Sequence, residues 1–160
     1  MGRFSGRAIR AWLLVALWFV AIWSFSGADF SAHSTSRFLG PLLRWLFSEI
    51  SAAELRSFHF ALRKGAHVFE YAVLSLLAYR ALRFSLDAAP WSLSALALTV
   101  VLAVASADEL HQSQLPARTG SYGDVALNLA GGALGVCLII GFYRALGRGP
   151  VPRRVSGKDG

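Results

Sequence analysis

Ionisable and amide side chains are concentrated in two stretches of this 160-residue chain, each beside a strongly apolar segment. The first stretch covers residues 63–71 and the second covers residues 108–135. Histidine and carboxylate side chains of this kind can transfer protons or ligate a metal, while lysine and arginine can hold an anion. We expect the two stretches to meet in space and to form a single site.

The spacing of these residues indicates helical faces. Lys64, His67 and Tyr71 stand at positions i, i+3 and i+7, so they share one side of a helix. Asp108 and Gln112 stand at i and i+4 and would face the same way if the helix extends that far.

A third group follows a 4-3-4 spacing, which places Asp124, Asn128, Gly131 and Gly135 in one stripe of a helix. A polar and glycine-containing stripe on an apolar helix suggests a face turned toward protein. The two glycines form a small-xxx-small pair, for which close helix packing is the favoured interpretation and a ligand role is not.

Three sets of candidate residues follow from this chemistry. The candidates for acid–base catalysis are His67, Glu70, Asp108 and Glu109. The candidates for ligand binding are Lys64, Tyr71, Gln112, Arg118, Asp124 and Asn128. No cofactor is predicted; a divalent metal such as Zn²⁺ remains an open alternative, although no HExxH or Cys/His spacing is present. Its candidate ligands are His67, Glu70, Asp108 and Asp124.

The rest of the chain must position these side chains within a membrane. Hydrophobic residues make up 55% of it and the mean hydropathy is +0.49, which is too apolar for an ordinary soluble domain. Apolar runs predict four spans, and between the first two a short amphipathic helix is expected in residues 39–50. The fold class is therefore an all-α, integral membrane four-helix bundle with that additional helix. The spans are expected at about 11–26, 66–82, 91–107 and 124–143.

Local signals mark the ends of these segments. Ser51 and Glu54 have the spacing of a capping box, so a helix is expected to begin there and to run into the second span. Residues 27–40 and 110–122 are expected to be loops, and residues 87–90 a short turn. Tryptophans in the first apolar run favour a retained helix over a signal peptide and are interpreted as interface anchors.

Basic residues predict the orientation and the partners. The formal net charge is +7, and more Lys and Arg residues fall on the side of the N-terminus, which places both termini in the cytoplasm. Three segments are expected: a basic N-terminus (1–10), a four-span domain (11–144) and a disordered basic tail (145–160). Membrane lipid is the expected partner; nucleic acid is not, because aromatic interleaving is absent. The oligomeric state is left open.

These motifs together resemble the VanZ-like family. The matching patterns are Arg-Lys-x-x-His-x-x-Glu-Tyr at 63–71, Asp-Glu-x-x-Gln-x-x-x-Pro-x-Arg at 108–118 and Asp-x-x-x-Asn-x-x-Gly-x-x-x-Gly at 124–135. The resemblance covers residues 12–144, and Ser24-Phe-Ser26 resembles the family's serine-rich segment. It implies a multi-pass protein of the bacterial plasma membrane, related to a namesake that raises teicoplanin resistance, but no established reaction.

The expected function is a change in glycopeptide susceptibility, through binding of an anionic cell-wall or lipid-linked component at a polar site on the outer face. Three alternatives stay open. One is a membrane-embedded hydrolase or transferase in which Glu70 or His67 provides acid–base chemistry. The second is a metal-dependent form of that enzyme. The third is a scaffold for another membrane protein, in which the polar residues form a hydrogen-bonded network that locks the helices together.

Overall fold

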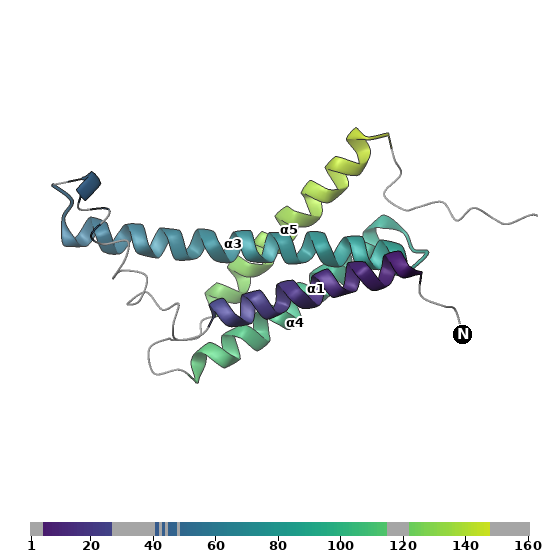
Figure 1. The fold of residues 1–160 in the computed structure, drawn as a ribbon, viewed down its shortest axis with the longest axis horizontal. Helices are drawn as coiled ribbons and strands as arrows, with labels where there is room; N and C mark the ends of the chain where they lie inside the picture. Colours follow the sequence, from purple (N-terminus) through teal and green to yellow (C-terminus); the bar gives the residue numbers. More distant parts are fainter. Residues whose placement is uncertain are drawn as a thin grey trace, which may run out of the picture.

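The computed structural model contains four long helices that follow one another along the chain. It describes residues 5–26, 41, 43, 45–47, 49–114 and 122–147. The helices are α1 (Gly6–Phe25), α3 (Ala52–Ser85), α4 (Pro90–Ser113) and α5 (Tyr122–Ala145). Among these residues every regular element is a helix, which confirms the all-α prediction. α3 is the central helix, because it packs against each of the other three (Figure 1).

The start and end of α3 follow from local chemistry. Ser51 and Glu54 form a reciprocal capping box, in which the Glu54 N–H donates to Ser51 Oγ and the Ser51 N–H donates to Glu54 Oε2. These hydrogen bonds from Ser51 hold the pKa of the Glu54 carboxyl below its usual range. The helix then runs to Ser85 without a break, as predicted. Pro90 begins α4, where its missing N–H costs nothing.

Two indole groups fix α1 against α3. Trp12 Nε1 donates to Ser85 Oγ at 3.0 Å, and Trp18 Nε1 donates to the backbone oxygen of Glu70 at 2.9 Å. Because the residue earlier in α1 meets the residue later in α3, the two helices are antiparallel. These tryptophans therefore make interhelical hydrogen bonds, a role that their interpretation as interface anchors did not include.

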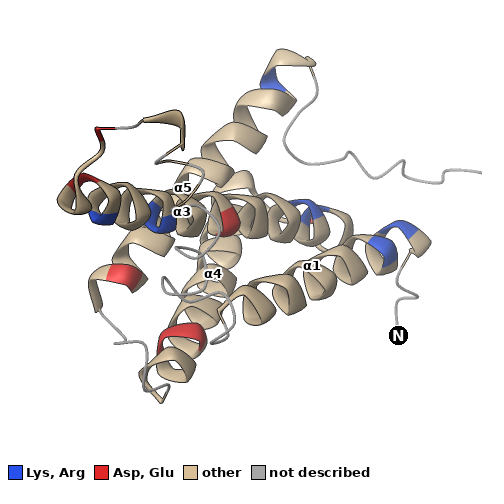
Figure 2. Cartoon of the chain, turned by 60° about the vertical axis from the view of Figure 1, so that its left-hand side comes forward, with Lys and Arg blue, Asp and Glu red and all other residues tan. Residues whose placement is uncertain are grey.

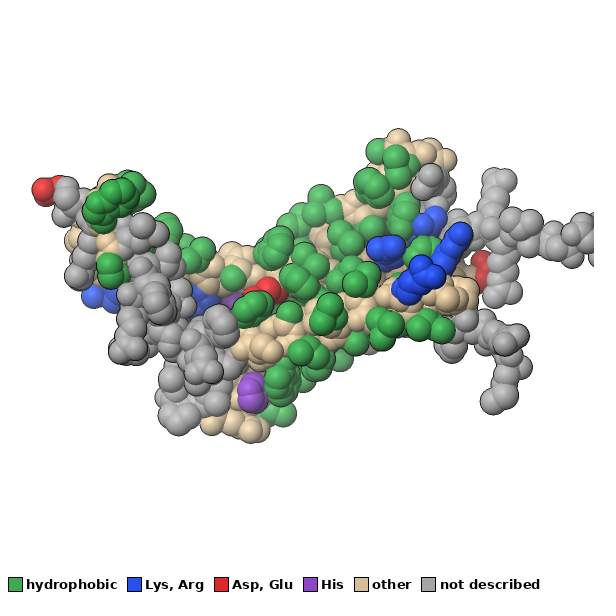
Figure 3. Space-filling model, in the orientation of Figure 1, with side chains coloured by type: hydrophobic (Ala, Val, Ile, Leu, Met, Phe, Trp, Pro, Cys, Tyr) green, Lys and Arg blue, Asp and Glu red, His purple; other side chains and the backbone are tan. Residues whose placement is uncertain are grey.

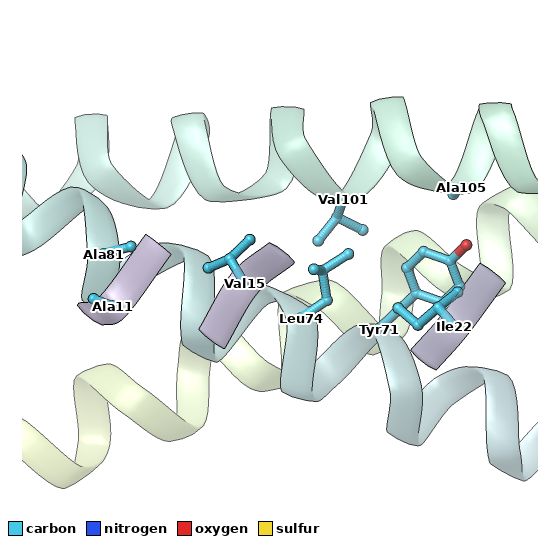
Figure 4. Packing of buried hydrophobic residues seen from close by; sticks show 8 residues of the cluster. All are labelled: Ala11, Val15, Ile22, Tyr71, Leu74, Ala81, Val101 and Ala105. Carbon is cyan, nitrogen blue, oxygen red and sulfur yellow. The ribbon is translucent and has the colours of Figure 1, made fainter. Parts of the chain in front are cut away.

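Two apolar clusters fill the spaces between the helices. The first joins α1, α3 and α4, and Figure 4 shows the Tyr71 ring between Ile22 of α1 and Ala105 of α4. The second joins α3, α4 and α5 and includes Ala78, Leu93 and Val136. Helices in lipid gain stability from such close van der Waals packing, since lipid tails are as apolar as the side chains.

Three of the four expected spans are long and apolar enough to cross a membrane: α1, α4 and α5. α3 is long enough but not apolar enough, because its middle carries Glu70 and Arg80. Its role as a membrane span therefore stays a prediction. The amphipathic helix expected in residues 39–50 is not confirmed, since residues 39, 40, 42, 44 and 48 lie outside the described residues. The expected loop at 27–40, residues 115–121 of the loop expected at 110–122, residues 1–4 of the N-terminal segment and residues 148–160 of the tail lie outside them as well.

The predicted start of the last loop, at Leu110, is wrong. α4 continues to Ser113, so Asp108 and Gln112 lie on a helix. Gln112 Nε2 donates to Asp108 Oδ2 at 2.9 Å across one turn, which gives these polar side chains a partner within the helix.

α5 touches α3 through glycine. A Cβ atom added to Gly131 would lie 2.5 Å from the backbone oxygen of Val68, and one added to Gly135 would clash with the backbone oxygen of Ala72 and with Ser75. The two backbones therefore approach too closely for any side chain at these positions. Since successive contacts advance along both helices, α3 and α5 are parallel.

We predict that Gly135→Ala lowers the free energy of unfolding by about 1–3 kcal/mol, because the new methyl group must displace backbone. Gly141→Ala is the matched control: Gly141 lies on the same helix, is exposed and has nothing within 4 Å of an added Cβ. The measurement is thermal unfolding of both variants in detergent. Equal unfolding temperatures would contradict the close contact.

Candidate functional site

Buried polar side chains gather at the end of the bundle that lies away from the N-terminus of α1. Figure 2 shows acidic residues on α3, α4 and α5 toward this end, whereas Lys and Arg lie toward both ends of α3 and at the start of α1. The buried polar residues at this end are Ser26, His67, Asp108, Glu109, Gln112, Asp124 and Asn128. The two sequence stretches expected to meet therefore do lie at one end of the same bundle.

A hydrogen-bonded group centred on Asp108 joins three helices. Asp108 Oδ2 accepts from Gln112 Nε2 at 2.9 Å and from the Tyr71 hydroxyl at 3.4 Å. Gln112 Nε2 also donates to Ser26 Oγ at 3.2 Å, which ties the end of α1 to α4. Asp108 Oδ1 and Gln112 Oε1 are buried without a hydrogen-bond partner among the described residues. Each of these two side chains therefore has one atom fixed by hydrogen bonds and one buried oxygen that no described residue satisfies.

An ion pair joins α3 to α5. Lys64 Nζ pairs with Asp124 Oδ1, and the Lys64 and Asp124 side chains are 28% and 7% exposed. Lys64 also lies over the Phe60 ring, 5.2 Å from its centroid. Asp124 is in the first turn of α5, where a negative charge is favourable. The expected anion-binding position, Lys64 beside the start of this helix, is therefore taken by the chain's own carboxylate.

Asn128 lies one turn after Asp124 on the face of α5 that meets α3. It is therefore between the ion pair with Lys64 and the contact of Gly131 with Val68. Its side chain is fully buried. Neither its amide nitrogen nor its amide oxygen has a hydrogen-bond partner among the described residues. A buried amide without partners costs about 1–3 kcal/mol, so this position is costly for a purely structural residue.

The remaining candidate residues are His67, Glu70, Glu109 and Arg118. His67 is buried on the face of α3 between Lys64 and Tyr71, and Glu109 is buried next to Asp108. Glu70 is half-buried, and its carboxyl, like that of Glu109, interacts electrostatically with the Tyr71 hydroxyl. Arg118 lies outside the described residues.

The candidate metal ligands do not assemble into a cluster in the described part of the chain. No three His, Cys, Asp or Glu side chains lie there in an arrangement that could hold a metal ion. Of the four candidate ligands, Asp108 belongs to the hydrogen-bonded group and Asp124 to the ion pair with Lys64.

Three contacts at the polar end of the bundle involve residues that were not predicted to belong to the site. Ser26 accepts the hydrogen bond from Gln112, although only its resemblance to the serine-rich segment had drawn attention to it. The ring of Trp23 stacks on His111, with centroids 4.5 Å apart. Trp18 binds the backbone of Glu70. All three pair α1 with a distant helix, and periodicity along one helix carries no signal for such pairs.

One comparison with known proteins identifies the family of this chain. Residues 11–144 match the VanZ/LLP1 family. Comparison with curated proteins and with solved structures gave no significant match. Since the family match extends over most of the sequence, the chain belongs to the VanZ/LLP1 family.

Proposed function

We propose that this protein is a multi-pass protein of the bacterial plasma membrane that lowers glycopeptide susceptibility, teicoplanin being the test compound. In this proposal it binds a cell-wall or lipid-linked component at its polar end, which faces the outside. The family membership supports the general role. The observation that carries the binding site is Asn128, a fully buried amide whose nitrogen and oxygen both lack a hydrogen-bond partner among the described residues.

The charges beside Asn128 suggest how an anionic group would be held. Lys64 is the most accessible member of the ion pair and lies at the edge of the site. A carboxylate or phosphate of the ligand could bind Lys64 from its exposed side, next to the Asp124 carboxylate. Polar groups of the ligand would then complete the hydrogen bonds of Asn128.

In the proposed topology α3 also crosses the membrane, as the second of four spans along the chain, and both termini are cytoplasmic. The packing supports it: α3 lies among the three apolar helices, where His67 and Ser75 are buried and Glu70 is half-buried. Arginines support the orientation, because Arg7, Arg10, Arg80, Arg83 and Arg144 mark the end that holds the N-terminus of α1.

Cysteine labelling in cells tests this topology. In a Cys137→Ala background, which removes the chain's single cysteine, Ser113→Cys should react with a membrane-impermeant maleimide in intact cells. Ala89→Cys, in the connection between α3 and α4, should react only after the membrane is opened. Both positions are exposed. Labelling of Ala89→Cys in intact cells would show that α3 does not cross the membrane or that the orientation is reversed.

Asn128→Leu tests the binding site. Because the amide has no partner among the described residues, we expect the variant to fold at least as stably as the wild type. We also expect it to lose protection against teicoplanin in a sensitive Gram-positive host, at matched membrane abundance. Ala126→Leu, at an exposed position of the same helix, is the control and should protect normally. Normal protection by Asn128→Leu would overturn the assignment, and a large loss of stability would favour a structural network.

The ion pair provides a second test. Lys64→Gln should lower the free energy of unfolding by up to about 3 kcal/mol, because it leaves the Asp124 charge buried without its partner. Lys64→Gln combined with Asp124→Asn removes both charges and should restore folding, as measured by thermal unfolding in detergent. In the proposed mechanism the double variant still fails to protect against teicoplanin, since the ligand's anionic group has lost its cation. Full protection by a folded double variant would make the pair purely structural.

A further inference from the structure

A long apolar groove runs along the outside of the α3–α5 pair, from Gly65 near the polar site toward the basic end of the bundle. It consists of two adjoining pockets that share Leu76 and Leu138. The first, of about 280 Å³, extends from Gly65 along α3, and the second, of about 600 Å³, extends to Arg80 and Tyr143. In Figure 3 hydrophobic side chains cover the surface between α3 and α5, and Lys and Arg side chains gather at its right-hand end.

The lining changes in character along the groove. The side chains of the first pocket are all apolar, with glycine at 65 and 135. The second pocket adds the Arg80 guanidinium and the Tyr143 ring, and neither lining contains a carboxylate. Arg83 lies over the same Tyr143 ring, 3.9 Å from its centroid. One end of the groove is therefore cationic and the rest is apolar.

This pattern fits an amphipathic anion. The fifteen residue steps from Gly65 to Arg80 span about 22 Å of helix, whereas half of a bilayer's hydrocarbon core is about 15 Å thick. An acyl chain that starts at Arg80 would fill the second pocket and enter the first. A single phosphate would meet Arg80 at the depth of the headgroups, where arginine attracts anionic lipid.

We propose that this groove binds an anionic glycerophospholipid from the leaflet at the basic end of the bundle. One acyl chain lies between α3 and α5, and the phosphate contacts Arg80. The inference needs α3 to lie in the membrane, but it does not depend on the ligand or the function of the polar end.

The experiment measures which lipids stay bound to the purified protein. Full-length protein is reconstituted into vesicles of phosphatidylcholine and phosphatidylglycerol, extracted in mild detergent and analysed by native mass spectrometry. Arg80→Gln removes the cation of the groove, and Arg144→Gln removes a charge at the same end of the bundle but outside the groove. Leu138→Trp fills the groove without changing any charge; Leu138 is 57% exposed, so folding should tolerate it. Leu102→Trp, at an exposed position of α4, is its control.

We expect Arg80→Gln to reduce bound phosphatidylglycerol about fivefold, in line with one arginine near the headgroups, and Arg144→Gln to have little effect. Leu138→Trp should also reduce it, whereas Leu102→Trp should not. Excess glycerol phosphate should fail to displace the lipid, because the acyl chain contributes to binding. Equal losses with Arg80→Gln and Arg144→Gln would indicate general surface charge and overturn the proposal. The proposal would also be overturned if Leu138→Trp kept its bound phosphatidylglycerol, or if glycerol phosphate displaced that lipid. A dimer of the wild-type protein that Leu138→Trp abolishes would overturn it as well, because a second copy would then occupy the groove.

Discussion

The contact on which this structure depends is the close approach of the α3 and α5 backbones at Gly131 and Gly135. Because no side chain fits there, the two helices can meet in only one register. That register brings Asp124 to Lys64 and leaves Asn128 between the ion pair and the glycine contact. A shift of one turn would separate the charges and place Cβ atoms against backbone. The glycines are therefore the structural condition for the polar site, although they take no part in its chemistry.

The position of α3 explains how an apolar bundle accommodates so many polar groups. A polar side chain is costly in lipid but can be tolerated among other helices, and α3 packs extensively against each of the other three. Its polar residues meet partners there, such as Tyr71 with Asp108 and Lys64 with Asp124. The three helices around it are free to be apolar for the same reason. The lower hydropathy of α3 thus reflects its central place.

Periodicity predicted a large part of this arrangement. The 4-3-4 stripe of α5, the capping box at Ser51 and three of the spans are all encoded by residues close together in the sequence. The predicted start of the last loop, at Leu110, is too early, because the polar residues that follow the apolar run remain helical and Gln112 bonds to Asp108 across one turn. The contact between Ser26 and Gln112 could not be predicted, because it depends on how α1 is placed against α4.

The chemistry of the Asn128 amide suits recognition. This amide does not gain or lose a proton near neutral pH, so its two atoms, which lack partners among the described residues, can bind a ligand but cannot act as acid or base. Asp108 has one open oxygen, yet its other oxygen is fixed by Tyr71 and Gln112 and the residue is almost fully buried. The Ser26 hydroxyl accepts from Gln112, and Ser75 donates to the backbone of its own helix. An activated hydroxyl would instead donate to a neighbouring base, which neither of these two serines does.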